Sequence, residues 1–277
     1  KQEAIKQNQG EQNSQNTKQK EDVDSNSSSL KGFSGIVETF LRRSRTVTFI
    51  TMLVPIYGII LCLMGLCLVP FMFIFNYVDQ ISYNWHIFFR YSAFGITITT
   101  GFFAYGFSLI FIIPLANFIL PTKLKTWRGI VYSLQAIPWY LHNALTYSVR
   151  YTFLKFITPT PFNILFYRMM GMKIGRGVQI NTINISDPCL MTMEDKVTIG
   201  GSATLICHYA VGGYLVIAPV KIGKKATVGI KATIMGDVEI GERAKILPNS
   251  VVMPKTRIPA GEIWGGVPAT FVKKARK

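Results

Sequence analysis

Aliphatic residues return at every sixth position along the C-terminal part of this chain. A helix repeats its apolar face every 3.6 residues and a strand every two, so neither element explains this step. A triangular coil with three flat faces of six residues does, because each face sends one aliphatic side chain to the axis. The step is kept without a slip at Ile222, Val228, Ile234, Ile240, Ile246, Val252 and Ile258. The pattern therefore predicts a mainly β fold, a parallel β-helix, in residues 166–277.

Three faces of six residues complete one turn of such a coil. Ile222, Ile240 and Ile258 are therefore expected to stack directly above one another. The same step opens the domain at Ile174 and resumes at Ile199 after an irregular stretch.

The six-residue repeat of aliphatic residues is interrupted between residues 208 and 222. The run HYAVGGYLVIAP is predicted to be a loop outside the coil. In repeat proteins an insertion of this kind usually lies on the functional face.

Two long uncharged segments precede the repeat, inside a predicted membrane region of residues 31–122. Residues 46–78 and 91–122 contain no charged side chain and are dominated by large apolar ones. About 20 apolar residues cross the hydrocarbon core of a bilayer, so both segments are predicted to be transmembrane helices.

The flanking segments set the expected topology. Residues 31–45 are typical of a short basic amphipathic helix on a membrane surface, and residues 123–165 of interfacial amphipathic helices. Basic residues gather before the first span and after the second, whereas the link between the spans has only Arg90 beside Asp79. By the positive-inside rule, the repeat domain is expected on the cytoplasmic side of a bacterial-type cytoplasmic membrane.

Composition favours a membrane protein over a nucleic-acid-binding one. The net charge is +16, yet hydrophobic residues make up 49% and charged residues only 16% of the chain. Because the basic residues flank apolar segments and no nucleic-acid-binding motif occurs, we expect a lipid bilayer as the partner and no nucleic acid. Residues 1–30, rich in Gln, Asn and Ser, are expected to be a disordered tail or linker. The chain begins at Lys1 without a signal-peptide pattern, which is compatible with a fragment of a longer protein.

Few side chains in the repeat region could carry chemistry. Of the three histidines, His86 lies in the predicted link and His142 in the interfacial segment, where both are expected to be structural. His208 stands where the interruption begins, which favours a functional role. With one histidine in the repeat domain, a zinc site with three histidine ligands is not expected. The four cysteines have no metal-binding spacing and are expected to be packed free thiols.

The segment from ICH through APVKIG and the hexad run to IWGGVPA resembles the left-handed β-helix acyltransferases of the hexapeptide-repeat superfamily. The resemblance covers about residues 165–272. The preceding GMKIGRGVQINTINISDP is similar to membrane-bound members, and to the C-terminal part of poly-lysine-type peptide synthetases.

The resemblance implies acyl transfer from acetyl-CoA or another acyl-CoA to a hydroxyl or amine. It implies no tightly bound cofactor, and a homotrimer with active sites between subunits. The family histidine corresponds to His208, which would act as general base. Asp187 is the best candidate for the carboxylate that orients it, although ISDP is also a turn sequence.

The resemblance also suggests residues around the coenzyme. Gly229 would let the thioester approach closely, or would simply serve a tight corner of the coil. Residues expected to bind the coenzyme are Gly229, Ala232, Ser250, Gly265, Gly266, Pro268, Lys273 and Lys274. The basic C-terminal residues would contact phosphates, or would form a solvated end.

Two other functions stay open. The domain could end a peptide synthetase that takes a carrier-protein thioester and forms an amide. It could also be a non-catalytic scaffold tethered to the membrane.

Overall fold

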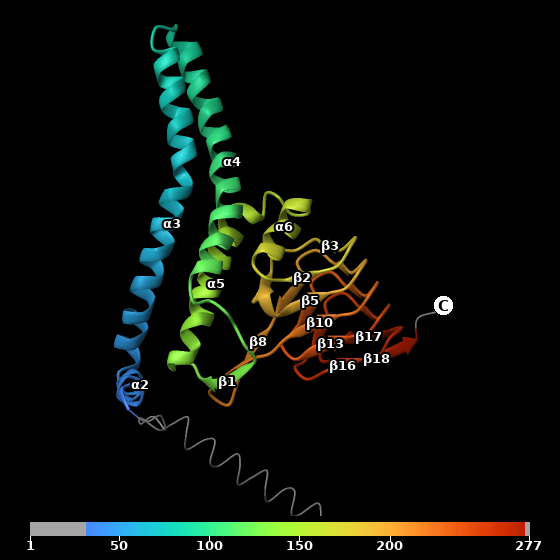
Figure 1. Cartoon of the computed structure of the whole chain (residues 1–277). Helices are drawn as coiled ribbons and strands as arrows, with labels where there is room; N and C mark the ends of the chain where they lie inside the picture. The colour runs from blue at the N-terminus through green and yellow to red at the C-terminus, as the bar shows by residue number, and fades with distance from the viewer. Residues whose placement is uncertain (1–31, 275–277) are drawn as a thin grey trace, which may run out of the picture.

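The computed structural model describes residues 32–274, so the predicted tail 1–30 and the last three residues lie outside the described part. A short helix, α2 (Phe33–Arg43), leads into two long antiparallel helices, α3 (Arg45–Ser82) and α4 (Ile87–Ile119). These two form an arm that extends away from a compact β-domain (Figure 1). Both helices are long and apolar enough to cross a membrane, and a stretch of 18 residues in each has a mean hydropathy of 2.6 and 2.0, respectively.

The two long helices run further than the predicted spans 46–78 and 91–122 at the tip of the arm. Only Tyr83–His86 separates them, and the charged pair of the predicted link is part of the helices. There Arg90 Nη2 donates to Asp79 Oδ1 at 2.7 Å, which joins α3 to α4. The charged residues Asp79 and Arg90 suggested a longer link than the structure has. Their ion pair between neighbouring helices satisfies both charges without a loop.

The region 123–165 is only partly helical. It contains a strand, β1 (Trp127–Ile130), and then η1 (Leu134–Ala136), α5 (Ile137–Val149), a π-helical turn η2 (Arg150–Leu154) and α6 (Pro161–Met169). The prediction of interfacial helices is therefore wrong for residues 127–130. This strand pairs with a segment about 90 residues later in the chain, which no local pattern indicates.

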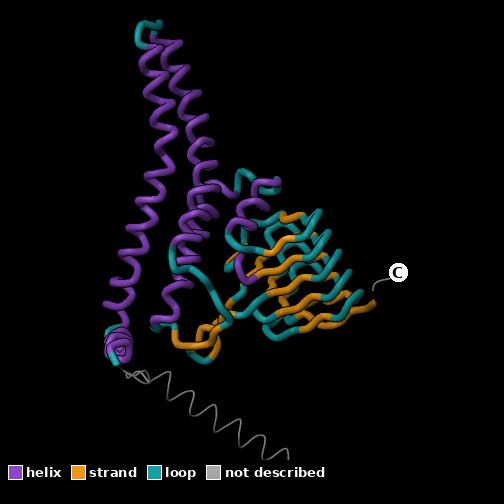
Figure 2. Tube along the Cα trace, viewed as in Figure 1, coloured by secondary structure: helices purple, strands orange, loops and turns teal. Residues whose placement is uncertain are grey.

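The predicted parallel β-helix is confirmed. Its strands form three parallel sheets that wind around a common axis (Figure 2). One sheet contains β2 (Lys173–Ile174), β5 (Met191–Met193), β10 (Val220–Ile222), β13 (Val238–Ile240) and β16 (Arg257–Ile258). A second contains β3 (Gln179–Ile180), β6 (Thr198–Ile199), β11 (Thr227–Val228), β14 (Lys245–Ile246), β17 (Glu262–Gly266) and the antiparallel β18 (Ala269–Lys274). The third contains β4 (Ile185–Ser186), β7 (Thr204–Ile206), β12 (Thr233–Ile234) and β15 (Val251–Val252).

The register of the strands matches the hexad prediction. Ile222 pairs with Ile240, and Ile240 with Ile258, so three hexads make one turn. All three side chains are at most 3% exposed. Because every turn repeats the same small set of contacts, the core is a continuous aliphatic column.

The corners of the coil use a left-handed backbone. Residues with φ between 55° and 65° recur every six positions, at Lys225, Lys231, Asp237, Arg243, Asn249 and Lys255. A small residue often follows at the next position, and Ala226, Ala232 and Ala244 are fully buried. The small side chain fits inside the corner that the preceding residue turns, which explains the second six-residue pattern of the sequence.

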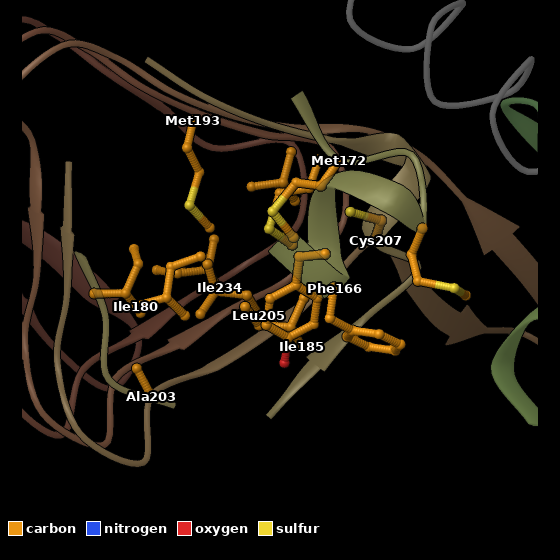
Figure 3. Close-up of a cluster of buried hydrophobic side chains, with 14 of the residues drawn as sticks. Phe166, Met172, Ile180, Ile185, Met193, Ala203, Leu205, Cys207 and Ile234 are labelled. Atoms are coloured by element: carbon orange, nitrogen blue, oxygen red, sulfur yellow. The ribbon is translucent and has the colours of Figure 1, made fainter. Parts of the chain in front are cut away.

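Helix α6 covers the first turn of the β-helix. Its Phe166 is fully buried and lies beside Ile185 and Leu205 of the third sheet (Figure 3). Asn163 from the same helix donates to the carbonyl of Ile180 at 2.8 Å. The helix therefore closes the open end of the apolar column and connects it to the arm.

The interruption of the repeat is not an irregular loop, as predicted, but a β-hairpin. Strands β8 (His208–Val211) and β9 (Tyr214–Ile217) pair antiparallel around Gly212–Gly213, and β9 also pairs with β1. Both glycines have positive φ, which a two-residue hairpin turn requires. Two apolar runs on either side of Gly-Gly are a hairpin signal that the hexad pattern obscured.

Candidate active site

His208 and Asp187 are brought together by the register of the β-helix. Ser186 of β4 pairs with Ile206 of β7, so the residues that follow these two strands leave the third sheet at the same corner, one turn apart. Asp187 itself has a left-handed backbone, with φ of 57°, and begins a short 3₁₀ turn. The irregular ISDP stretch is thus both a turn and the source of a carboxylate directed at His208.

The two side chains form a close pair. His208 Nδ1 lies 2.5 Å from Asp187 Oδ2, and the Asp187 side chain is fully buried. The other carboxylate oxygen, Oδ1, accepts a hydrogen bond from Asn143 Nδ2 at 2.8 Å. Asn143 belongs to α5, so the carboxylate joins the repeat domain to the helical part.

Asp187 is ionised despite its burial. Burial alone would raise the pKa of its carboxyl, but the hydrogen bonds from His208 and Asn143 and the nearby imidazole charge lower the pKa below its ordinary value. An ionised carboxylate only accepts hydrogen bonds, so His208 Nδ1 carries the proton. In the neutral form of the imidazole, the lone pair therefore lies on Nε2, away from Asp187.

The His208 ring is held from one side and open on another. The indole of Trp139 packs edge to face against it, with ring centroids 5.0 Å apart. The His208 side chain is 20% exposed. No hydrogen-bond partner for Nε2 occurs among residues 32–274. The described contacts therefore orient the ring and leave its basic nitrogen accessible.

A second histidine lies behind this pair without reaching the surface. His142 Nδ1 is 2.8 Å from Asn117 Oδ1 of α4, and its Nε2 is 3.6 Å from Cys189 Sγ. Burial lowers the pKa of His142 to about 4, although the Asp187 charge opposes this effect. Burial also raises the pKa of the Cys189 thiol to about 12. Both groups are neutral near pH 7, which suits a packing role.

A cavity of about 530 Å³ opens beside His208, between α3 and α5. One wall is a single face of α3, formed by Leu53, Ile56, Tyr57, Ile60 and Met64. The other wall comes from α5 and η2, formed by Trp139, Tyr140, Asn143, Ala144, Tyr147, Ser148, Tyr151 and Thr152. Among residues 32–274, neither Lys nor Arg lines this cavity, although Arg150 packs against the rings of Tyr147 and Tyr151. Such a volume lies within the range of small-molecule sites, roughly 300–1,000 Å³.

A second hollow, of about 460 Å³, lies on the outer face of the first sheet. Its lining includes charged residues, among them Glu194, Lys221 and Arg257. It includes none of the site residues predicted from the sequence.

The glycine and small residues predicted around the thioester lie elsewhere in the single chain. Gly229 is at the corner between the second and third sheets, whereas His208 follows the third. A Cβ on Gly229 would lie 2.5 Å from the backbone nitrogen of Pro248, so stacking of the turns alone requires glycine there. Ala232 and Ser250 are fully buried in the coil. Their expected place beside the coenzyme, in a groove between adjacent copies of the chain, stays a prediction.

The other predicted coenzyme residues belong to one terminal hairpin. Gly265 and Gly266 end β17, Pro268 lies in the turn, and Lys273 and Lys274 are on the exposed strand β18. The amide of Gly266 donates to Ser250 Oγ at 3.2 Å, which fastens the hairpin to the turn before it. This hairpin is on the last turn of the coil, and His208 follows the second. The single chain therefore does not bring these residues to His208.

Sequence reasoning missed three residues around His208. Asn143 and Trp139 come from α5, and an aromatic and amide-containing helix carries no signal of such a role. The third, Gly236, would place a Cβ 3.1 Å from the His208 amide nitrogen. Gly236 lies in the turn of the coil that follows the interruption, and this position in the repeat could have indicated that it lies close to His208.

No group of three or more His, Cys, Asp or Glu side chains that could hold a metal occurs within the described range 32–274. The four cysteines, all of them in this range, are free.

The comparisons with known proteins match the repeat. Residues 219–254 match the family model described as "Bacterial transferase hexapeptide (six repeats)". A delta-poly-L-ornithine synthetase from Acinetobacter baumannii is 31% identical over 105 residues, which are 38% of this chain and 8% of the synthetase. Gamma carbonic anhydrase 2 from Arabidopsis thaliana, a mitochondrial protein, is 36% identical over 107 residues, 36% of this chain and 34% of that protein.

A solved structure also resembles the chain. It is a hexapeptide-repeat-containing acetyltransferase from Vibrio cholerae in complex with acetyl coenzyme A, 25% identical, with a TM-score of 0.35 over 39% of this chain and 62% of that one. The chain thus spans at most about a third of the two curated relatives named above. The part of the β-helix formed by residues 219–254 therefore carries the hexapeptide repeat of bacterial transferases.

Proposed function

We propose that this chain is a membrane-bound acyltransferase that moves an acetyl or other acyl group from an acyl-CoA thioester to a hydroxyl or amine acceptor. The observation that carries the proposal is the chain of contacts from Asn143 through Asp187 to His208. It ends on the imidazole of His208, whose Nε2 has no hydrogen-bond partner among residues 32–274 and whose side chain lines a cavity. The matched family description, a transferase repeat, supports the same class of reaction.

The proposed reaction needs one base and no covalent enzyme intermediate. Nε2 of His208 takes the proton from the acceptor hydroxyl or amine as its oxygen or nitrogen attacks the thioester carbonyl carbon. The ionised Asp187 stabilises the imidazolium that forms. The tetrahedral intermediate collapses, the carbon–sulfur bond breaks, and the thiolate leaves with the proton that Nε2 returns. The products are the acylated acceptor and free CoA.

The donor is proposed to lie between neighbouring copies of the chain. Gly229 and the terminal hairpin with Lys273 and Lys274 are distant from His208 along one coil, so they would serve His208 of an adjacent copy. In a homotrimer, the backbone amides near Gly229 would then stabilise the oxyanion, and the two lysines would pair with phosphates. This part rests on the resemblance to the acyltransferase family.

The membrane setting rests on α3 and α4. Their length and apolar composition support two spans, and the basic flanks favour a cytoplasmic repeat domain. A cytoplasmic site suits the donor, because CoA thioesters are found there.

Replacement of His208 tests the proposal. The full chain in lipid nanodiscs would be given acetyl-CoA and a panel of hydroxyl and amine acceptors. Thiol release and acceptor mass would be followed together. We expect His208→Ala to lower the rate about 10²- to 10⁴-fold, the usual contribution of a general base. His86→Asn is the matched control, because an asparagine keeps the helix cap at the far tip of the arm. Equal rates for wild type and His208→Ala would leave a membrane-tethered scaffold as the better explanation.

A second candidate function follows from the similarity to the poly-ornithine synthetase. There the domain would accept an amino acid thioester on a carrier protein and form an amide. The discriminating measurement compares a carrier-bound aminoacyl thioester with acetyl-CoA as donor. Turnover with the carrier-bound donor alone would replace the CoA-dependent proposal.

A further inference from the structure

We infer that the cavity between α3 and α5 receives the aliphatic chain of a membrane-resident acceptor, whose hydroxyl or amine then reaches His208. The inference rests on the proposed acyl transfer and adds the chemical class of the acceptor. The first step in the argument is position. His208 itself lines the cavity, and its free nitrogen is the one that must touch the acceptor.

The second step is the chemistry of the walls. Leu53, Ile56, Ile60 and Met64 of α3 face Ala144 and the aromatic residues of α5 across the cavity. The hydroxyls of Ser148 and Thr152 donate to carbonyls of their own helix, and the Tyr147 hydroxyl bonds to Ser186. Because most wall atoms are apolar and these three hydroxyls have partners, the cavity fits a hydrocarbon chain better than a free sugar.

The third step is charge, which disfavours the phosphate-bearing end of the donor. A CoA molecule carries several phosphate charges, and phosphates in proteins are bound by Lys, Arg or helix amino termini. The lining of the cavity contains neither Lys nor Arg. The acceptor, whose only required polar group is the one at His208, suits it better.

The fourth step is access from the bilayer. Helix α3 contributes one face to the cavity, while its other faces are exposed and apolar, with Val54 65% and Leu61 70% exposed. These faces suit contact with lipid, so the same helix borders both the bilayer and the cavity. Figure 1 shows α3 and α5 side by side, with α5 between α3 and the β-domain. An amphiphile could therefore enter beside α3 without leaving the membrane.

The first experiment measures chain-length dependence. Acceptors with one sugar headgroup and linear alkyl chains of increasing length would be offered below their aggregation threshold, to the full chain in a detergent that does not carry hydroxyl groups. Each methylene buried from water is worth about a fourfold gain in binding. We expect kcat/KM to rise severalfold with each added methylene until the cavity is filled, and then to level off.

Two filling variants sharpen the measurement. Leu53→Trp and Ala144→Phe place bulk in the cavity from opposite walls, and Val54→Trp makes the same change one residue along, on an exposed position of α3. The filling variants should lose at least tenfold in kcat/KM with long-chain acceptors and retain the rate with the shortest ones. Val54→Trp should match the wild type with both.

The outcomes separate this inference from the proposed function. If His208→Ala abolishes turnover while chain length and the filling variants have no effect, the acyltransferase proposal holds and the lipid-chain inference is overturned. If no acceptor is acylated, a binding measurement still tests the cavity. A fatty alcohol bearing a diazirine would label α3 and α5 peptides in a manner that excess unlabelled alcohol and Ala144→Phe both suppress. Labelling that neither suppresses would overturn the inference.

Discussion

The β-helix and the helical arm bury their apolar residues in opposite ways. In the β-helix, aliphatic side chains at a six-residue step point to one axis and are almost fully buried, as at Ile222, Ile240 and Ile258. In the arm, apolar residues face outward as well, and Phe118 of α4 is 80% exposed. The β-helix therefore has a core of its own, whereas the arm leaves much of its apolar surface exposed. The candidate site uses both regions, since His208 and Asp187 come from the first and Asn143 and Trp139 from the second.

The largest expected effect comes from Asp187, where the two regions meet. Asp187→Asn removes the charge that fixes the proton on His208 Nδ1 and stabilises the imidazolium. We expect kcat to fall about 10²- to 10⁴-fold while the fold is kept. Steady-state thiol release would measure the loss. Asp79→Asn, which breaks the ion pair at the tip of the arm, is the control and should leave kcat unchanged. An unaltered rate in Asp187→Asn would contradict the proposed role.

The next largest effect is on stability, and it should differ between the core of the β-helix and the surface of the arm. Ile240→Ala leaves a cavity in the aliphatic column and should cost about 2–5 kcal/mol in the free energy of unfolding. Leu61→Ala, on an exposed face of α3, should change it by less than about 0.5 kcal/mol. Thermal unfolding of the β signal in circular dichroism measures both. A similar loss of Tm in the two variants would mean that the regions do not differ as described.

Acid should weaken the contact between the regions. The folded protein holds His142 neutral, with a pKa of about 4 against 6.5 in an exposed chain. The unfolded chain therefore binds an extra proton between these values, and the free energy of unfolding falls by about 3 kcal/mol as the pH drops from 6.5 to 4. The lowered pKa of Asp187 acts only below this window, because its carboxylate is still ionised there.

Denaturant titrations between pH 7 and pH 4 would check this dependence. His142→Asn should remove most of the slope, since an amide has no proton to gain. A variant as pH-sensitive as the wild type would show that another group is responsible.

The smallest effect concerns support from α5. Asn143→Ala removes a hydrogen bond to the buried carboxylate, and we expect kcat to fall about 10- to 100-fold with KM for the donor unchanged. Thr146→Ala, on the same helix, removes a buried hydroxyl that bonds only within the helix and should keep kcat. Equal kcat in the two variants would show that α5 packs against the site without assisting it.

The β-helix was predictable because its signal is periodic and local. If a strand shifted by one residue, its aliphatic side chains would leave the core and face solvent. The spacing of residues such as Ile222 and Ile240 therefore determines how the strands pair. The pairing of His208 with Asp187 was suggested by the resemblance to the acyltransferase family, and only the structure showed that both residues lie at one corner of the coil. The six-residue step did not show that Ala232 and Ser250 are buried inside the corners of the coil, so their roles beside the coenzyme stay predictions.

The helical contribution was not predictable by the same reasoning. Asn143 is one polar residue on a mostly apolar helix, and its partner is 44 residues away. Residues 127–130 form a strand only because they pair with β9, and their own sequence does not indicate this pairing. Long-range contacts that occur once in a fold leave no period in the sequence, so they become visible only in three dimensions.

The pairing of β1 with β9 has a mechanical consequence. The strand β1 follows the second long helix after a few residues, and β9 leads back from the hairpin that begins at His208. These four residue pairs connect the hairpin to the segment that follows α4, so they should hold the imidazole at a fixed height relative to the end of that helix. If α3 and α4 span a bilayer, the distance of His208 from the lipid surface is also fixed. An acceptor would then react only if its hydroxyl or amine lies at that same distance from the lipid surface. Selectivity would then depend on the length of the acceptor headgroup as well as on its chemistry.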